Sequence, residues 1–469
     1  MTAPGSPMNE SRREATAVVG AGAVESRPRP RVGIVLAAGR SERLHTVTGG
    51  GSKALVRVGG ITLVERAVRT LMSGGLEEVV VVVGYHAGPV GAVVSRIGLG
   101  RVRTVLAERW EGGNGASLAA AEAAVEGEDL FVLVTTDHVF GENALHDLLQ
   151  STGPAVLIDP NPTPNVWMEG TRVRVLGRRV ADLGKELQEP AVDCGAFVLR
   201  HEVFAFQRLA EAEGDHSLAG AVAILAERRP LGAVEIRPTA WWCDIDTPQD
   251  LRTARSVLRR SLGRTTDGPV SRYLNRPLST RISMGIAPLR PSPDLLSYAA
   301  LLVAVLGAWL AGTGRAILAA VAIQGASVLD GVDGEIARLQ VRARALGAML
   351  DGVFDRVGDA AIIGGFGLWA LSRTTHSPRA ILVLVTTATA GAIMSMASKD
   401  RAAALGLPPA PEPVLGWLLG GRDGRLLILA VGAALGRPFE GLVVVSATSV
   451  LALLVRMLFL RHGGGRKKL

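Results

Sequence analysis

The sequence predicts two unlike halves, an α/β doubly wound domain followed by an all-α transmembrane domain of six helices. Hydrophobic residues make up 48% of the 469 residues, and the mean hydropathy is +0.30. In residues 31–262, short apolar runs alternate with helical patterns, which is typical of a sheet with crossover helices. In residues 294–462, apolar stretches recur that are near the roughly 20 residues needed to cross a bilayer.

Changes in composition predict the domain boundaries. Residues 1–30 are rich in Pro, Gly, Ser, Ala and Arg and lack an apolar segment, so we expect a disordered tail. The α/β domain covers residues 31–262 and the transmembrane domain residues 294–462, with a basic cytoplasmic tail at 463–469. Arginines and prolines in residues 263–293 favour a basic amphipathic segment at the membrane surface over a flexible linker.

Four apolar runs in the first half are predicted strands: Val32–Ala37, Val79–Val83, Leu130–Val134 and Ala155–Ile158. Leu63–Ser73 and Ser117–Val125 between them are predicted helices. The first run is followed by Gly39 and a polar loop to Lys53, as expected for a buried strand that leads into a phosphate-binding turn. Ligands of such sheets bind at the carboxyl ends of the strands.

Six apolar spans are predicted in the second half: Leu295–Ala311, Ala316–Ala337, Leu346–Leu371, Ala380–Ala397, Val414–Leu435 and Phe439–Leu460. The fifth is the weakest, because Arg422, Asp423 and Arg425 interrupt it. An even number of spans places both chain ends on one side, and most loop cations lie on that side too. The positive-inside rule makes this side cytoplasmic. We therefore expect a multi-pass protein of the cell membrane, with the soluble domain and both termini in the cytoplasm.

The formal net charge of +8 does not indicate nucleic-acid binding. The arginines cluster beside apolar spans, and no basic patch is interleaved with aromatic residues, so membrane lipids are the expected partner. The two cysteines, Cys194 and Cys243, provide neither a disulfide framework nor a zinc-binding spacing.

Four aspartates lie within one otherwise apolar stretch. The pattern is Asp330-x2-Asp333-Gly334-x2-Ala337-Arg338, eight residues, then Gly347-x3-Asp351-x3-Asp355. A mid-membrane aspartate costs about 2.5–3.5 kcal/mol on insertion scales, so a compensating group is expected. Steps of three and four residues return to one helix face, and two such faces would form an oxygen cage suited to Mg²⁺ or Mn²⁺. Acidic residues at a wet helix end are the alternative, but they explain neither the glycines nor the spacing.

This pattern resembles, position for position, the signature of CDP-alcohol phosphatidyltransferases. The resemblance implies a membrane enzyme in which two metal ions, held by the four aspartates, clamp the pyrophosphate of a CDP-alcohol. It implies that Asp355 is the general base on the acceptor hydroxyl and that CMP leaves. It also implies nucleotide contacts at Gly334, Ala337 and Arg338. The family often forms homodimers through its helices.

Lys399 and Arg401 follow the fourth predicted span. Their position matches the place where the CDP-alcohol family is proposed to hold the acceptor phosphate. Plain positive-inside charge explains the two residues equally well.

The segment Leu36-Ala37-Ala38-Gly39-Arg40-Ser41-Glu42-Arg43-Leu44, with Lys53 downstream, resembles the opening signature of sugar-nucleotide nucleotidyltransferases. The resemblance implies that residues from Leu36 to Gly39 contact the nucleotide and that Arg43 and Lys53 neutralise its triphosphate in catalysis. The chain departs from the usual pattern at Ser41, where a second glycine is common, and at Ser52, where a proline often stands.

Further segments extend this resemblance. Thr135–His138 follows a strand where the family keeps a metal-binding aspartate, here Asp137, while its partner ligand is either Asp244 or Asp246. The turn at residues 113–118 resembles a cytidine-recognition turn, with contacts from Asn114, Gly115 and Ser117. Lys185 is the expected contact for an acceptor phosphate. We expect the His138 side chain to form hydrogen bonds with polar groups at the strand end rather than to act in catalysis.

Together the segments resemble a CTP:inositol-1-phosphate cytidylyltransferase fused ahead of a CDP-alcohol phosphotransferase, as in the bifunctional enzymes of di-myo-inositol phosphate phosphate synthesis. The resemblance implies CTP and inositol 1-phosphate as substrates, CDP-inositol as intermediate and at least one Mg²⁺ or Mn²⁺ ion in the soluble domain. Other polyol phosphates, or a lipid acceptor as in phospholipid synthases, remain alternatives. A further alternative is a non-enzymatic, membrane-tethered protein that binds a nucleotide or a metal. The four-aspartate signature argues against this alternative.

Overall fold

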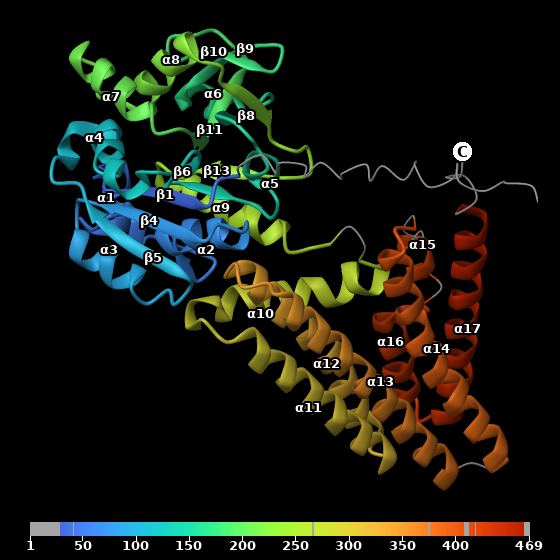
Figure 1. The fold of residues 1–469 in the computed structure, drawn as a ribbon. Helices are drawn as coiled ribbons and strands as arrows, with labels where there is room; N and C mark the ends of the chain where they lie inside the picture. Colours follow the sequence, from blue (N-terminus) through green and yellow to red (C-terminus); the bar gives the residue numbers. More distant parts are fainter. Residues whose placement is uncertain are drawn as a thin grey trace, which may run out of the picture.

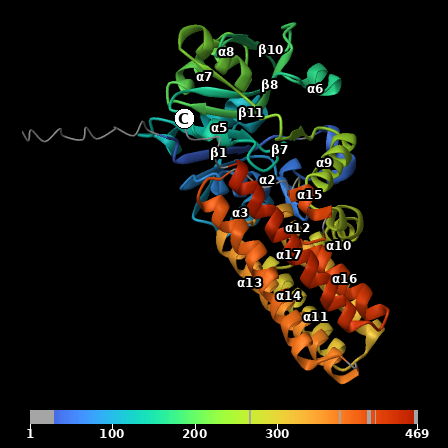
Figure 2. The ribbon, with the colours of Figure 1, turned by 90° about the vertical axis from the view of Figure 1, so that its right-hand side faces the viewer.

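The computed structural model describes residues 29–40, 42–264, 267–373, 376–407, 412–417 and 419–463. Most of the predicted N-terminal tail and nearly all of the C-terminal tail lie outside the described residues. The α/β half stands at one end of a helical bundle (Figure 1), and a view from the side shows the long helices running away from it (Figure 2).

A nine-stranded sheet forms the centre of the α/β half. Its order is β5 (Arg101–Leu106), β4 (Glu78–Val83), β1 (Val32–Ala37), β6 (Phe131–Thr135), β11 (Ala191–Leu199), β8 (Ala155–Asp159), β12 (Gly232–Glu235), β10 (Arg179–Gly184) and β9 (Arg172–Leu176). Strands β5, β4, β1 and β6 are parallel, whereas β11 runs antiparallel to both β6 and β8. Two short ribbons flank the sheet, β2 (Arg57–Val58) with β3 (Ile61–Thr62), and β7 (His138–Phe140) with β13 (Trp242–Asp244).

Helices cover both faces of this sheet, which is why its central strands are continuously apolar. In β1, Ile34 packs into the core on one face and Val35 into the core on the other, and both are fully buried. The helices of the soluble half are α1 (His45–Thr48), α2 (Leu63–Ser73), α3 (Ala87–Val94), α4 (Gly113–Ala119), α5 (His146–Leu149), α6 (Pro164–Glu169), α7 (Val203–Ala212), α8 (Leu218–Arg228) and α9 (Pro248–Arg260). The predicted helix at residues 117–125 is split, because α4 ends at Ala119 and a 3-10 turn follows at Glu122–Val125.

The second half is helical. Its elements are α10 (Arg276–Ile286), α11 (Pro293–Gly312), α12 (Ala316–Leu339), α13 (Ala345–Arg373), α14 (Pro378–Ala404), α15 (Glu412–Trp417), α16 (Arg422–Ala434) and α17 (Pro438–Gly463). Small residues let these helices approach closely. A Cβ atom on Gly365 of α13, for example, would lie 2.3 Å from the carbonyl oxygen of Ala308 on α11.

Among the described helices, α11, α12, α14 and α17 are long and apolar enough to cross a membrane. Helix α13 has 29 residues but carries several aspartates, and α16 has only 13 residues. The predicted count of six spans therefore stays a prediction.

The segment between the halves is largely helical. Glu335 of α12 is completely buried and accepts hydrogen bonds from Arg276 (2.8 Å), Ser279 (2.7 Å) and Ser283 (2.6 Å) of α10. These bonds satisfy a carboxylate that would otherwise be costly to bury. They fix α10 along α12.

Candidate functional sites

The first site is a cavity of about 300 Å³ at the carboxyl ends of β1 and β6. Predicted nucleotide-binding residues line it: Leu36, Ala37, Ala38, Gly39, Lys53, Asn114 and Ser117, together with Asp137. Gly115 is buried behind the lining, where a Cβ atom would lie 2.3 Å from Gln207 Nε2. The Asn114 side chain accepts a hydrogen bond from the Leu218 amide (2.8 Å), which holds this turn against α8.

Lys53 is the buried cation of this cavity. Its Nζ lies 3.1 Å from Asp137 Oδ2 and 2.5 Å from Asp246 Oδ1. Burial lowers the pKa of Lys53, but the carboxylates of Asp137, Asp246 and Asp244 outweigh this effect and raise the pKa above its ordinary value. The ammonium group is therefore charged at neutral pH and faces the space where a triphosphate would lie.

Asp137, His138 and Asp244 each offer a ligand atom, and these atoms lie within 4.8 Å of one another. Asp244 Oδ1 is buried and has no hydrogen-bond partner. Two close carboxylates, one with an unsatisfied oxygen, fit a hard divalent cation. The structure groups Asp244 with Asp137, whereas Asp246 contacts Lys53 and, through its other oxygen (3.1 Å), Arg43.

His138 lies inside this cluster. Its Nδ1 is 2.7 Å from Thr135 Oγ1 and 2.8 Å from Asp137 Oδ1, and its ring stacks on Trp242. Burial lowers the pKa of His138, but Asp244 and Asp137 more than compensate and raise it to about 9. Thr135 is the last residue of β6, so His138 does form a hydrogen bond at the strand end, as expected, and it also lies beside Asp137. That His138 does not act in catalysis stays a prediction.

Arg43 and Lys185 lie outside the lining of the cavity. Arg43 is exposed and bridges Asp246 to Glu169 of α6 (3.1 Å to each). Lys185 is exposed after β10, and its carbonyl oxygen accepts a hydrogen bond from Arg172.

The second site is a cavity of about 320 Å³ in the helical half. Residues of α12, α13, α14 and α17 line it, together with α15, the start of α16 and the segment 264–271. Asp330 of α12 and Asp351 and Asp355 of α13 bring carboxylate oxygens within 4.8 Å of one another. This oxygen-only donor set fits Mg²⁺ or Mn²⁺. Asp333 lies outside this group, because it is buried against α11 and accepts a hydrogen bond from Ser297.

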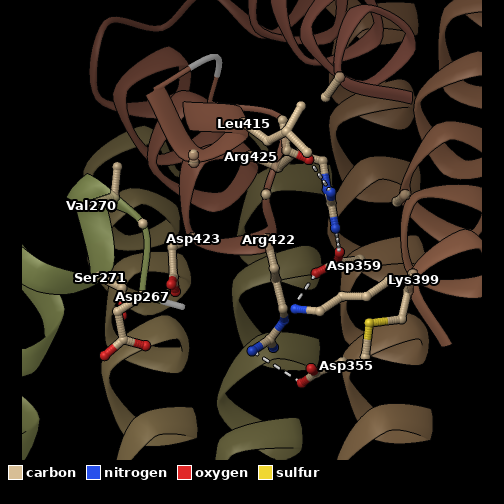
Figure 3. Close-up of a pocket in the computed structure, with 18 of the residues that line it drawn as sticks. Asp267, Val270, Ser271, Asp355, Asp359, Lys399, Leu415, Arg422, Asp423 and Arg425 are labelled. Atoms are coloured by element: carbon tan, nitrogen blue, oxygen red, sulfur yellow. Dashed lines mark hydrogen bonds and ion pairs between the residues drawn. The ribbon is translucent and has the colours of Figure 1, made fainter. Parts of the chain in front are cut away.

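Arg422 is a residue of this cavity that the sequence reasoning missed. Its Nη1 lies 2.6 Å from Asp330 Oδ2. The same Nη1 is 3.0 Å from Asp355 Oδ1, and Arg422 Nε is 3.4 Å from Asp359 Oδ1 (Figure 3). Arg425 holds the other oxygen of Asp359 at 2.8 Å. The charges that seemed only to break the fifth span therefore enter the acidic cavity.

Lys399 of α14 lines the same cavity, with its side chain directed toward Arg422 and Asp355 (Figure 3). Arg401 is exposed and lies outside the lining. Gly334, Ala337 and Arg338, the expected nucleotide contacts, also lie outside it. Arg338 instead donates a hydrogen bond to the Leu262 carbonyl (3.1 Å), at the end of the soluble domain.

Comparisons with known proteins match each half to a family. Residues 33–261 match the model of the MobA-like NTP transferase domain, and residues 291–419 match CDP-alcohol phosphatidyltransferase. The chain is 37% identical to the bifunctional IPC transferase and DIPP synthase of Rubrobacter xylanophilus over 92% of this chain and 96% of that protein. This chain belongs to the bifunctional IPC transferase and DIPP synthase family.

A second relative agrees with this assignment. The bifunctional IPC transferase and DIPP synthase of Thermococcus kodakarensis is 31% identical, covering 85% of this chain and 89% of the relative. A solved inositol-1-phosphate CTP transferase from T. maritima has a TM-score of 0.45 at 25% identity, covering 49% of this chain and 96% of that one.

The assignment makes this family member an enzyme with two transferase domains and, given the four apolar helices among the described residues, a membrane protein. Each family model covers one acidic cluster. The CDP-alcohol model ends at residue 419, so Arg422 lies beyond the matched residues.

Proposed function

We propose that this family member makes CDP-inositol from CTP and inositol 1-phosphate in its soluble domain. The membrane domain then transfers phosphoinositol from CDP-inositol to a second inositol 1-phosphate and releases CMP. The observation that carries the proposal is that one chain holds two separate cavities, each combining clustered carboxylates with a cationic side chain. The dephosphorylated end product would be a compatible solute.

In the soluble site, a phosphate oxygen of inositol 1-phosphate attacks the α-phosphorus of CTP, and pyrophosphate leaves. Lys53 is held in place by Asp137 and Asp246, so its charge is preorganised for the negative charge that develops on the phosphates. A divalent ion held by Asp137 and Asp244 would add charge neutralisation at the same phosphates. The backbone after β1, from Ala38 to Gly39, borders the cavity where those phosphates would lie.

In the membrane site, Asp355 accepts the proton of the acceptor hydroxyl. The resulting oxygen attacks the inositol-bearing phosphorus of CDP-inositol, a phosphodiester bond forms, and CMP carries away the electron pair of the broken bond. Mg²⁺ or Mn²⁺ ions held by Asp330, Asp351 and Asp355 would neutralise the pyrophosphate. We propose that two such ions bind here and that Asp333 is a further ligand.

The basic residues at the cavity end of the bundle support a cytoplasmic orientation of the soluble domain and of both termini. Arg338 lies in the last turn of α12, Arg342 and Arg344 follow that helix, and Lys399 and Arg401 lie near the end of α14. Membrane lipids would then surround the bundle, and both cavities would open to the same compartment.

Lys399→Met is expected to raise the KM for inositol 1-phosphate in CMP release by about tenfold or more. A charge-assisted hydrogen bond to a phosphate contributes about 1.5–3 kcal/mol. Initial rates with CDP-inositol in excess and varied inositol 1-phosphate measure this effect. Arg401→Met should change this KM less, because Arg401 lies outside the cavity. A larger increase in KM for Arg401→Met than for Lys399→Met would place the acceptor phosphate at Arg401.

The assay that tests the function uses the purified full-length chain in nanodiscs with Mg²⁺ and CTP. Inositol 1-phosphate should yield pyrophosphate and CDP-inositol first, and then CMP and di-myo-inositol phosphate phosphate. Glycerol 3-phosphate and other polyol phosphates serve as competing substrates. A CDP-adduct from one of these, with none from inositol 1-phosphate, would show that the assigned alcohol is wrong. CMP release with a lipid acceptor in place of inositol 1-phosphate would instead identify a phospholipid synthase.

A further inference from the structure

A buried arginine of the soluble domain contacts the helix that carries two of the membrane-domain aspartates. Arg66 of α2 is 3% exposed, and its Nη2 donates hydrogen bonds to the carbonyl oxygens of Val58 (2.7 Å) and Leu339 (2.5 Å). Within the described part of the chain no carboxylate forms an ion pair with it, and burial lowers its pKa to about 10. The carbonyl groups of Val58 and Leu339 are therefore the main compensation for the free energy that burial of the Arg66 charge costs.

Leu339 is the last residue of α12. The final four carbonyl groups of a helix have no partner within the helix, and the negative end of the helix dipole attracts a cation. Arg66 therefore caps α12 from another domain. At about 1.5 Å per residue, the capped end lies about 13 Å along the axis from Asp330 and about 9 Å from Asp333. A rigid helix transmits a displacement over such a distance.

The hairpin β2–β3 places Arg66 at this boundary. Its turn residues Gly59 and Gly60 both have positive φ angles (+62° and +87°). A Cβ atom on Gly60 would lie 2.2 Å from the carbonyl oxygen of Ala287, between α10 and α11. A Cβ atom on Gly59 would lie 2.8 Å from Arg66 itself. The hairpin tip therefore sits directly on backbone of the helical half, with no room for side chains.

Apolar packing and a second polar contact complete the contact between the domains. Val58 and Leu258 of the soluble domain pack in one buried cluster with Val332, Ile336 and Leu339 of α12. Beside them Glu65, which is 1% exposed, binds Arg69 of its own helix (2.9 Å) and Arg290 of the segment before α11. The close packing gives α2 and α12 one relative position, with Arg66 as the polar contact at its centre.

We propose that Arg66 is a positioning residue for the membrane-domain transfer, which it supports by holding the carboxyl end of α12 and thereby the placement of Asp330 and Asp333. This inference rests on the proposed function. A residue of the first catalytic domain then helps set the rate of the second reaction without contacting its substrates.

The test compares Arg66→Met, which retains the apolar stem but removes the donors, with wild type in nanodiscs. With CDP-inositol and inositol 1-phosphate supplied, the kcat for CMP release should fall about tenfold or more, because small misplacements of reacting groups are costly. The KM for inositol 1-phosphate should change less than twofold. Pyrophosphate release from CTP, measured on the same preparation, should stay within twofold. Hydrogen exchange at the amides of residues 340–342, which bond back into α12, should become faster.

Arg103→Met is the control, since Arg103 of β5 donates hydrogen bonds to Glu78 and to the carbonyl oxygen of Ala124 within its own domain. It should leave CMP release within twofold of wild type. Arg66→Lys, which keeps one donor group, should restore part of the lost kcat and keeps the test open if the methionine variant does not fold. Unchanged CMP release in both Arg66 variants, or an equal loss of both half-reactions, would overturn the proposal.

The proposed function can fail separately from this inference. If wild type releases CMP from a different CDP-alcohol and not from CDP-inositol, the substrate assignment fails. The Arg66 comparison is then made with that CDP-alcohol and retains its meaning.

Discussion

Asp355→Asn is expected to abolish CMP release from CDP-inositol while pyrophosphate release from CTP continues. The carboxylate of Asp355 lies in the acidic cluster with Asp330 and Asp351, and an amide cannot accept the acceptor proton. General base catalysis typically contributes about 10²–10⁴-fold, so a loss of at least this size is expected. The change also removes one of the two carboxylates that hold Arg422 Nη1. Separate assays of CMP and pyrophosphate on one preparation measure the result.

Asp400→Asn is the matched control for this change. Asp400 is an exposed aspartate near the end of α14 and lies outside the lining of the cavity. It should leave both half-reactions unchanged. Wild-type CMP release by the Asp355 variant would assign the base elsewhere.

Asp137→Asn should have the opposite effect. Asp137 holds Lys53 at 3.1 Å and belongs to the cluster with His138 and Asp244. Loss of its charge weakens a preorganised electrostatic site, for which single deletions cost about 10²–10³-fold in kcat. Pyrophosphate release should fall by this factor, whereas CMP release from supplied CDP-inositol should persist.

Asp129→Asn, at a half-exposed position before β6, is the control for the soluble domain. Product formation starting from CTP should stop in the Asp137 variant and resume when CDP-inositol is added. If the Asp137 and Asp355 variants each lose both half-reactions, the two sites are not independent.

Local sequence patterns predicted several of the elements and the spacing of the aspartates in the helical half. The apolar run Val32–Ala37 predicted β1 residue for residue, and Leu63–Ser73 predicted α2, because burial on both faces or on one stripe leaves a periodic pattern. Asp351 and Asp355 share a face of α13 because their spacing of four residues matches the helical repeat. These patterns depend only on residues that are close together in the sequence, so they can be recognised from the sequence alone.

Contacts between distant residues left no such pattern. Lys53 meets Asp137 across 84 residues and Asp246 across 193, and the choice of Asp244 over Asp246 for the cluster with Asp137 depends on how β13 pairs with β7. The antiparallel β11 in the middle of the sheet was also not predicted. Its apolar residues have the same composition as those of a parallel strand.

The sequence by itself determined that this protein joins an α/β domain to an apolar helical domain, and that four aspartates recur at helical spacing within the latter. Both features follow from periodicities of two to four residues, which the backbone geometry imposes. The tertiary structure alone decided that Arg422 enters the acidic cavity, that Asp333 turns to Ser297, and that Arg66 caps α12 from the other domain. These placements depend on how helices and strands far apart in the chain pack together, and packing depends on shape rather than on the order of residues.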